Sequence, residues 1–333
     1  MTIVAVIIPF FQRRPGILRR ALTSVVGQRL PHGVHVHIYI CDDASPVRSD
    51  GEVRDLPLPD GFSIEVIVQQ NGGASAARNA CLDAMKPNTD FVAFLDSDDY
   101  WEPGHLAAAL ALLGRGFDYY FCNNRRVGAH DSYFAQNGFG QYLKDQGTPL
   151  GEDDYEVPSA AFMSFSLRAW TSLTPTVVFR RSAAPELRFN PALRAAGEDC
   201  HFLLHLISRT DRVCCSTAIN VTCADGVNIF YSTYDWDDPG HLPRRVGQLQ
   251  KSYLFLSDLP ISDADRRYVL SCIAREREDV VFFSLREMGK KGPGAFGKLD
   301  ALRRTDRHFW SWYLPTAAKI AVRLPFGGVQ PRD

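Results

Sequence analysis

The sequence predicts an α/β protein built around an open β-sheet. In the N-terminal third, apolar runs of strand length alternate with segments whose apolar residues recur at helical spacing. The runs are nearly uninterrupted, which is typical of parallel strands that helices cover on both faces. Several of these runs end in polar residues, and open α/β sheets bind their ligands beyond the carboxyl ends of the strands. The pattern therefore predicts the fold class and the edge of the sheet where the functional site lies.

Four strands and three helices are expected in this region, taken in order along the chain. The strands cover residues 3–10, 35–43, 62–70 and 91–99. Residues 17–28 and the Ala-rich residues 74–85 form the first two helices. A third helix covers residues 103–116, with Pro103 in its first turn and Gly114 near its end. The polar residues that follow the strands are Gln12, Asp42, Asp43, Asn71, Asp96, Asp98 and Asp99.

The remainder of the chain is less regular and then becomes helical. Residues 118–125 and 174–181 are predicted strands, and the long segment between them is typical of a binding loop. A helix is expected to begin at Gly197-Glu198-Asp199. Two further helices are expected over residues 241–259 and 262–288, and Ser262 with Asp265 resembles a capping box. We expect a catalytic sheet domain over residues 1–225 and a helical extension over residues 226–333.

Three carboxylates stand at the end of the fourth strand, in the stretch FLDSDDYW of Phe94–Trp101. Asp99 precedes the third helix, and capping that helix explains its presence. Asp96 and Asp98 alternate and are expected to share one face of an extended segment, where their charges repel unless a cation neutralises them. Mg²⁺ and Mn²⁺ prefer oxygen ligands, often carboxylates together with substrate phosphates. The pair therefore predicts a metal-bridged phosphate site.

Five motifs occur in a fixed order: IIPFFQR, CDDAS, NGGASAARN, FLDSDDYWEPGHL and GEDCHFLLHL. Together they resemble the inverting family-2 glycosyltransferases of the GT-A fold, which transfer sugars from nucleotide diphosphate donors. The resemblance covers roughly residues 3–225 and implies a Rossmann-like open mixed sheet flanked by helices. It places a nucleotide-sugar half over about residues 1–115 and an acceptor half over about residues 116–225. The opening residues are similar to those of bacterial exopolysaccharide enzymes that add glucose in succinoglycan synthesis.

The resemblance also implies a role for each matching position. Asp98 corresponds to the direct ligand of a divalent metal, Mn²⁺ or Mg²⁺, and Asp96 to a residue facing the ribose or a metal-bound water. Phe11 stands where the family often has Tyr, so stacking on the base is kept and the hydroxyl is lost. The implied nucleotide-sugar site consists of Pro9, Phe11, Asp43, Arg78 and Asp96.

The motif GEDCHF supplies the expected catalytic base. Asp199 lies where the family places this base, and its neighbour Glu198 is expected to contact the acceptor. The position at a helix start stabilises the anion and so weakens the base, and a helix cap is the alternative role for either acid. His241 lies in the region where related enzymes supply a late metal ligand, and the sequence does not assign it.

The C-terminal segment combines basic and aromatic residues. From Gly289 onward there are nine Lys or Arg residues and three Asp residues, interleaved with Phe309, Trp310, Trp312 and Tyr313. Such a composition suits peripheral contact with an anionic membrane surface, which a lipid-linked acceptor would make useful. A tail packed on the catalytic domain explains the same residues, and both interpretations stay open.

Composition limits the function classes. A formal net charge of −1 argues against nucleic acid as a partner. The eight cysteines lack CxxC spacing, which suits reduced thiols in the cytoplasm, and the N-terminus lacks the features of a signal peptide. We expect a metal-dependent glycosyltransferase that moves a sugar, with glucose as the expected one, from a UDP-sugar to a free or lipid-linked oligosaccharide in exopolysaccharide synthesis. It would be cytoplasmic or peripheral on the inner face of the cell membrane. The alternative function is a non-catalytic nucleotide-sugar-binding module of a polysaccharide-assembly complex.

Overall fold

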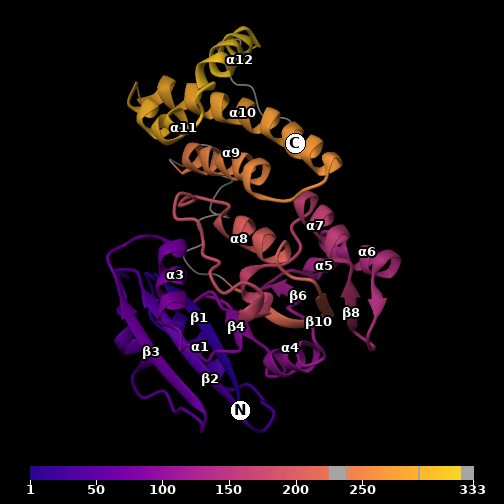
Figure 1. Cartoon of the computed structure of the whole chain (residues 1–333). Coiled ribbons are helices and arrows are strands. Elements are labelled where there is room, and N and C mark those ends of the chain that lie inside the picture. The colour runs from indigo at the N-terminus through magenta and orange to yellow at the C-terminus, as the bar shows by residue number, and fades with distance from the viewer. Residues whose placement is uncertain (225–237, 239, 292, 324–333) are drawn as a thin grey trace. The chain divides into compact units, whose positions relative to one another are not determined.

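The computed structural model describes residues 1–224, 238, 240–291 and 293–323, which fall into two compact units. The sheet unit comprises Met1–Arg194 and Glu198–Ile229. The helical unit comprises Ala195–Gly197 and Phe230–Asp333. Figure 1 shows the sheet unit in indigo to orange-red and the helical unit mainly in orange and yellow. Each unit is described by itself below.

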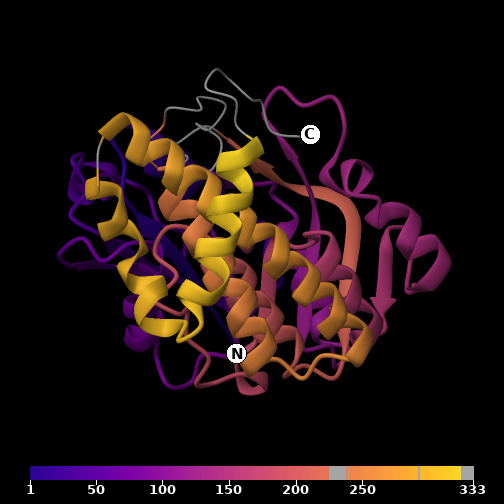
Figure 2. The same ribbon diagram turned by 90° about the horizontal axis from the view of Figure 1, so that it is seen from above.

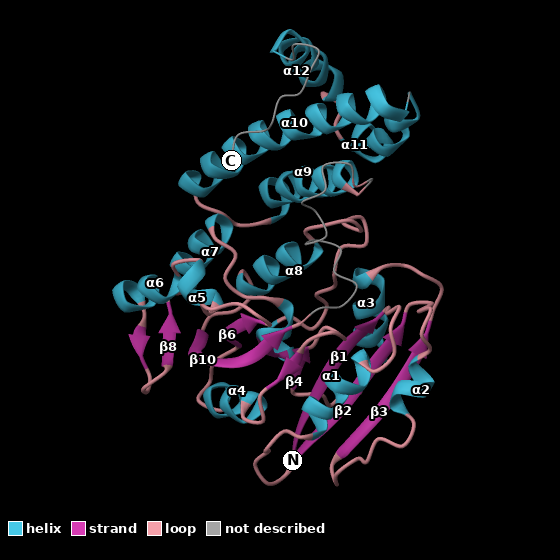
Figure 3. Ribbon diagram, turned by 180° about the vertical axis from the view of Figure 1, so that it is seen from behind, coloured by secondary structure: helices cyan, strands magenta, loops and turns pink. Residues whose placement is uncertain are grey.

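The sheet unit contains one open, mixed sheet of ten strands, in the order β3-β2-β1-β4-β9-β6-β10-β8-β7, with β5 paired to β10. Strands β1 to β4 run parallel, β9 is antiparallel to both of its neighbours, and β10 is parallel to β6. The predicted fold class is therefore confirmed (Figure 3). The strands are β1 Thr2–Phe10, β2 Val34–Asp42, β3 Phe62–Val68, β4 Phe91–Phe94, β5 Tyr100–Trp101, β6 Tyr119–Arg126, β7 Thr148–Pro149, β8 Asp154–Val157, β9 Val177–Arg180 and β10 Val213–Cys223.

Helices cover both faces of this sheet. Alternate residues of β1, Val4, Val6 and Ile8, pack with the buried faces of α1 and α4 in one hydrophobic cluster. On the other face, Phe94 of β4 contacts Phe202 of α8 at 5.4 Å between ring centroids, and α3 contacts β1 and β2. The helices of this unit are α1 Ile17–Val26, α2 Ser49–Val53, α3 Ala74–Ala84, α4 His105–Leu113, α5 Tyr133–Gln136, α6 Phe139–Gln146, α7 Ser159–Arg168 and α8 Glu198–Ile207, with 3₁₀ turns at Thr174–Thr176 and Arg181–Ala183.

Two parts of the sheet unit differ from the sequence-based expectation. The stretch between β6 and β9, expected to be a single long loop, contains α5, α6, α7 and the β7–β8 hairpin. Its phenylalanines form a buried aromatic cluster with Phe121, including Phe162 stacked on it at 4.9 Å between centroids. Strand β10 was not predicted, because its sequence VCCSTAINVTC lacks the apolar run of the other central strands.

The helical unit contains α9 His241–Asp258, α10 Asp263–Lys291, a 3₁₀ helix at Pro293–Leu299, α11 Asp300–Thr305 and α12 Phe309–Arg323. The Ser262 hydroxyl accepts a hydrogen bond from the Asp265 N–H at 3.1 Å, as the predicted cap requires. Helix α10 packs against α9 and α12, and Figure 2 shows α12, in yellow, against α10. None of the helices in the described residues has the length and apolar character needed to cross a bilayer.

Candidate active site

The acids after β4 lie in a tight turn. The backbone N–H of Asp99 donates to the carbonyl of Asp96 at 3.0 Å and closes a turn over these four residues. We expected an extended segment with Asp96 and Asp98 on one face, and that expectation is wrong. The strand stops at Phe94, and the turn places Asp96 close enough for its negative charge to act on Asp98.

We expected Asp99 to cap the following helix, and that expectation is wrong. Its carboxylate accepts a hydrogen bond from the backbone N–H of Ala224 at 2.9 Å, directly after β10. Helix α4 begins only at His105. Burial, followed by the charges of Asp96 and Asp98, raises the pKa of Asp99 well above its ordinary range. The side chain therefore joins the acidic turn to the end of a central strand.

Asp98 is held under electrostatic strain in the metal-free chain. Burial, followed by repulsion from Asp96, raises the pKa of Asp98 to about 6. Arg20 of α1 donates at 2.8 Å to the backbone carbonyl of Asp98, and not to its carboxylate. A cation at this turn would relieve the repulsion between the two acids. Arg20 therefore holds the backbone of the turn, and its charge partly offsets the rise in the pKa of Asp98.

The turn fits a divalent cation. One or two carboxylates, with substrate phosphates completing the shell, are a common ligand set for Mg²⁺. Asp96 and Asp98 supply the carboxylates, and within the described residues no third His, Cys or acidic ligand atom is grouped with them. His241 belongs to the helical unit, where its ring stacks on Phe283 at 5.0 Å between centroids.

Arg78 of α3 connects the acidic turn to the acids of α8. Its Nη2 donates to Asp96 Oδ1 at 2.7 Å, and its Nη1 lies 3.6 Å from Glu198 Oε1. The guanidinium lies over the Phe189 ring at 5.0 Å, and the residue is 5% exposed. Its Nε and Nη1 are buried and have no hydrogen-bond partner among the residues that the structure describes. One cation therefore faces carboxylates from two distant segments, and its Nε and Nη1 remain unused in hydrogen bonds within the described part of the chain.

The next residue of the same motif fixes the approach to α8. The Asn79 side chain donates to the Phe189 carbonyl and accepts from the Phe189 N–H, both at 2.8 Å. This reciprocal pair holds the loop that leads to Glu198 and Asp199. Sequence analysis assigned a role to Arg78 in SAARN but missed Asn79, because nothing local indicates a partner so far along the chain.

The two acids of α8 differ in their surroundings. Burial, followed by the charge of Asp199, raises the pKa of Glu198 to about 7, and the opposite charge of Arg78 limits the rise. Asp199 Oδ1 accepts a hydrogen bond from the Cys200 N–H at 2.8 Å. This bond comes from the adjacent residue and is not the N-cap bond, which an N–H two or three positions further on would donate, but it fixes the direction of the Asp199 carboxylate. Both acids lie in the first turn of α8.

Asp43 organises the loop that follows β3. Its carboxylate accepts hydrogen bonds from Gln69 Nε2 and from the backbone N–H groups of Gly72 and Gly73, at 2.7 to 2.8 Å. Gly73 has φ 86°, and a Cβ on Gly72 would lie 2.7 Å from Ala76 Cβ, so the NGG sequence is required by geometry. A carboxylate offers about four acceptor positions, and three are used here.

The other expected nucleotide residues lie at the same edge of the sheet. Pro9, in register with Cys41 of β2, and Phe11 are both half-buried at the end of β1. The buried Gln12 side chain donates to the Ser97 hydroxyl at 3.1 Å and so ties this loop to the acidic turn. Arg194, which the sequence did not indicate, donates to the Asn71 side-chain oxygen at 2.7 Å.

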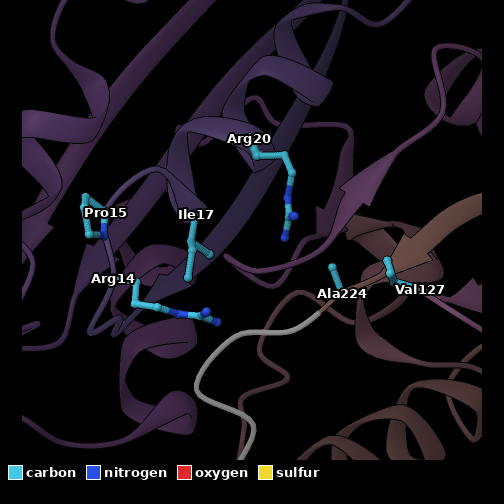
Figure 4. A pocket seen from close by; sticks show the side chains of 6 residues that line it. All are labelled: Arg14, Pro15, Ile17, Arg20, Val127 and Ala224. Atoms are coloured by element: carbon cyan, nitrogen blue, oxygen red, sulfur yellow. The ribbon is translucent and has the colours of Figure 1, made fainter.

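A cavity of about 330 Å³ opens beside the acidic turn. Figure 4 shows the guanidinium groups of Arg14 and Arg20 directed into it. Neither arginine forms an ion pair among the described residues, although the charge of Arg20 acts on the nearby Asp98 and lowers its pKa. Guanidinium groups match the geometry of phosphate oxygens. The residues that line it are Arg14, Pro15, Ile17, Arg20, Val127 and Ala224.

Comparison with known proteins agrees with this geometry. The sequence profile of "Glycosyl transferase family 2" matches residues 5–169. The succinoglycan biosynthesis protein ExoW of Rhizobium meliloti (strain 1021) is 35% identical over 247 residues, which cover 74% of this chain and 76% of that protein. The chain therefore belongs to glycosyl transferase family 2, and the resemblance noted in the sequence is confirmed.

Solved structures share the fold at low sequence identity. S. aureus TarS 1–349 in complex with UDP-GlcNAc has a TM-score of 0.56 and 16% identity, covering 98% of this chain and 82% of that one. The chain spans 54% of a longer TarS structure, with a TM-score of 0.58. Mannosyltransferase PcManGT from Pyrobaculum calidifontis, in complex with GDP-Man and Mn²⁺, has a TM-score of 0.52 and 16% identity, covering 96% and 85%. These likenesses establish the GT-A fold.

Asp98→Asn tests the electrostatic strain at the turn. The pKa of Asp98 is raised from 3.8 to about 6, so the folded chain binds this proton more tightly than the unfolded chain. The stability that this provides is fully present below pH 4 and is lost as the pH rises through 6, where the charged carboxylate destabilises the folded chain. The neutral amide should therefore stabilise the metal-free chain at pH 8, by up to about 3 kcal/mol, with the gain vanishing toward pH 4. Thermal denaturation in EDTA measures this difference. Exposed Asp60→Asn is the control, and an equal, pH-independent effect of both variants would contradict the account.

Arg78→Met tests the buried link between the turn and α8. Removing one partner of a buried ion pair costs about 3–5 kcal/mol, because the remaining charges are left uncompensated. Adding Glu198→Gln should restore part of that loss, because it removes one of the two acids, Asp96 and Glu198, that lose their cation. Urea unfolding of both single variants and the double variant measures the coupling. Strict additivity of the two losses would show that Arg78 and Glu198 do not interact.

Proposed function

We propose that this chain is a metal-dependent, inverting glycosyltransferase that moves a sugar, with glucose as the first candidate, from a UDP-sugar to an acceptor hydroxyl. The observation that carries the proposal is the placement of two acidic sites, Asp96–Asp99 and Glu198–Asp199, on either side of the buried Arg78. The names of the relatives support it, since ExoW acts in succinoglycan biosynthesis and the solved structures hold UDP-GlcNAc or GDP-Man with Mn²⁺. The acceptor would be an oligosaccharide, free or lipid-linked, in exopolysaccharide synthesis.

The donor would lie in the half formed by about residues 1–115. Pro9, Phe11 and Asp43 would border the base, and Asp96 and Arg78 the ribose and diphosphate. Asp98 and Asp96 would hold the Mn²⁺ or Mg²⁺, which when bound supplies Lewis-acid stabilisation of the departing diphosphate. The unused donors of Arg78 support this arrangement, because a buried N–H without a partner is costly unless a ligand satisfies it.

The acceptor would occupy the half formed by about residues 116–225, with Glu198 in contact with it. Its hydroxyl oxygen would attack the anomeric carbon while the bond to the diphosphate breaks, and the hydroxyl proton would pass to Asp199. The hydrogen bond from the Cys200 N–H to Asp199 Oδ1 would fix the direction of the carboxylate that receives this proton. Arg14 and Arg20 would add positive charge beside the diphosphate as it leaves.

A panel of donors tests the function. The chain is incubated with UDP-glucose, UDP-galactose, UDP-GlcNAc or GDP-mannose, with an oligosaccharide acceptor and Mn²⁺ or Mg²⁺, and release of the nucleoside diphosphate is followed. We expect release with a UDP-sugar, stimulated by the acceptor and abolished by EDTA. Binding of a UDP-sugar without transfer to any acceptor would instead favour the non-catalytic module. Full turnover in EDTA would refute the metal site.

Asp199→Asn tests the assignment of the base. A general base contributes about 10²–10⁴-fold in rate, so kcat should fall by that factor while UDP affinity stays nearly unchanged. The matched variant Glu198→Gln should act mainly on the KM of the acceptor. Steady-state kinetics with both substrates varied separates the two effects. Near-normal kcat in Asp199→Asn, with the large loss in Glu198→Gln, would transfer the catalytic role to Glu198.

A further inference from the structure

Helix α12 presents an apolar stripe to solvent. Trp310 and Leu314 are 45% and 57% exposed, and Val322 is 87% exposed. Ala318 and Ala321 are exposed as well and continue the spacing of Trp310 and Leu314 along one side of the helix. These five residues, Trp310, Leu314, Ala318, Ala321 and Val322, are called the α12 stripe here. Exposed apolar residues that line up in this way indicate a surface with a partner.

The opposite side of the same helix is anchored within the helical unit. Phe309, Trp312 and Tyr313 are buried. The Tyr313 hydroxyl shares a hydrogen bond of 2.7 Å with Ser284 of α10, and Trp312 Nε1 donates to Asp306 at 2.7 Å. These contacts lie within the helical unit, so they test neither packing on the catalytic domain nor membrane contact. The packed side fixes the helix, and this holds the α12 stripe outward.

The charged residues beside the α12 stripe are basic. Arg304 and Arg307 are exposed, and neither forms an ion pair among the described residues. Arg303 pairs with Asp300 at 3.0 Å and also lies over the Trp310 ring at 5.3 Å. The other nearby acid, Asp306, has a side chain only 9% exposed and accepts hydrogen bonds from Tyr253 and Trp312. The net charge offered to a partner is thus positive.

We propose that the α12 stripe forms a docking surface for an anionic lipid bilayer together with Arg304 and Arg307, which form no ion pair among the described residues. An exposed Trp beside basic residues is typical of a helix that lies in the headgroup region with its apolar side toward the acyl chains. A second copy of the chain fits less well, because a symmetric contact would bring two positively charged rims together. This docking surface rests on the proposed function, because contact with a membrane serves the reaction if the acceptor is lipid-linked.

Binding of the full chain to vesicles tests the docking surface. Co-sedimentation is measured with vesicles of phosphatidylcholine alone and of phosphatidylcholine with phosphatidylglycerol. We expect binding to the anionic vesicles only, weakened by salt, because each arginine near an anionic surface contributes about fivefold in affinity. The double variant Trp310→Ser/Leu314→Ser should lose most of this binding. Arg304→Gln should weaken it about fivefold.

Matched controls lie on α10. Leu270 is 50% exposed, and Arg267 is exposed and forms no ion pair in the described ranges, so Leu270→Ser and Arg267→Gln change the same chemistry elsewhere in the helical unit. Both should bind like the unchanged chain. Binding that is absent, or equally reduced by the control variants, would overturn the proposal. The proposal would also fail if light scattering showed that the chain is a dimer and that Trp310→Ser/Leu314→Ser dissociates the dimer without loss of vesicle binding. Transfer to a soluble acceptor, measured in the same preparations, should be unaffected and tests the proposed function separately.

Discussion

The candidate site depends on one buried guanidinium. Arg78 lies between Asp96, at the end of β4, and Glu198, at the start of α8. A buried cation requires opposite charge nearby, and each buried acid requires a cation, so neither can move away without a large electrostatic penalty. The two acids are consequently held in place in the metal-free chain. This pre-organisation limits the reorganisation that remains when substrates bind.

The same edge of the sheet carries more negative charge than Arg78 can balance. The pKa values of Asp98, Asp99 and Glu198 are all raised, first by burial and then by neighbouring carboxylates. Such clusters lower the stability of the free protein, and they occur at functional sites because ligands relieve the repulsion. A metal with a nucleoside diphosphate would be a ligand of this kind, since the cation would screen the acids and the arginines would receive the phosphates. The excess charge is therefore an argument for function that does not depend on family membership.

The sequence predicted those parts of the molecule whose signals are local. Apolar runs located β1 to β4, the glycines of NGG indicated the turn beside Asp43, and the acids after Phe94 indicated the candidate site. Contacts between distant residues gave no such signal. The Asp99 carboxylate accepts a hydrogen bond from the Ala224 N–H, 125 positions away, and Asn79 pairs with Phe189 at a separation of 110 positions. Both contacts are determined by the packed sheet and not by neighbouring residues, which explains why the helix-capping role predicted for Asp99 was wrong.

The most direct test of the account is a crystal structure of the chain with UDP and Mn²⁺, with the metal located by its anomalous scattering. The account predicts an anomalous peak on the Asp98 carboxylate, bridged to the diphosphate, with the base near Phe11 and Asp43. A peak at another location, or a nucleotide bound away from the acidic turn, would contradict it.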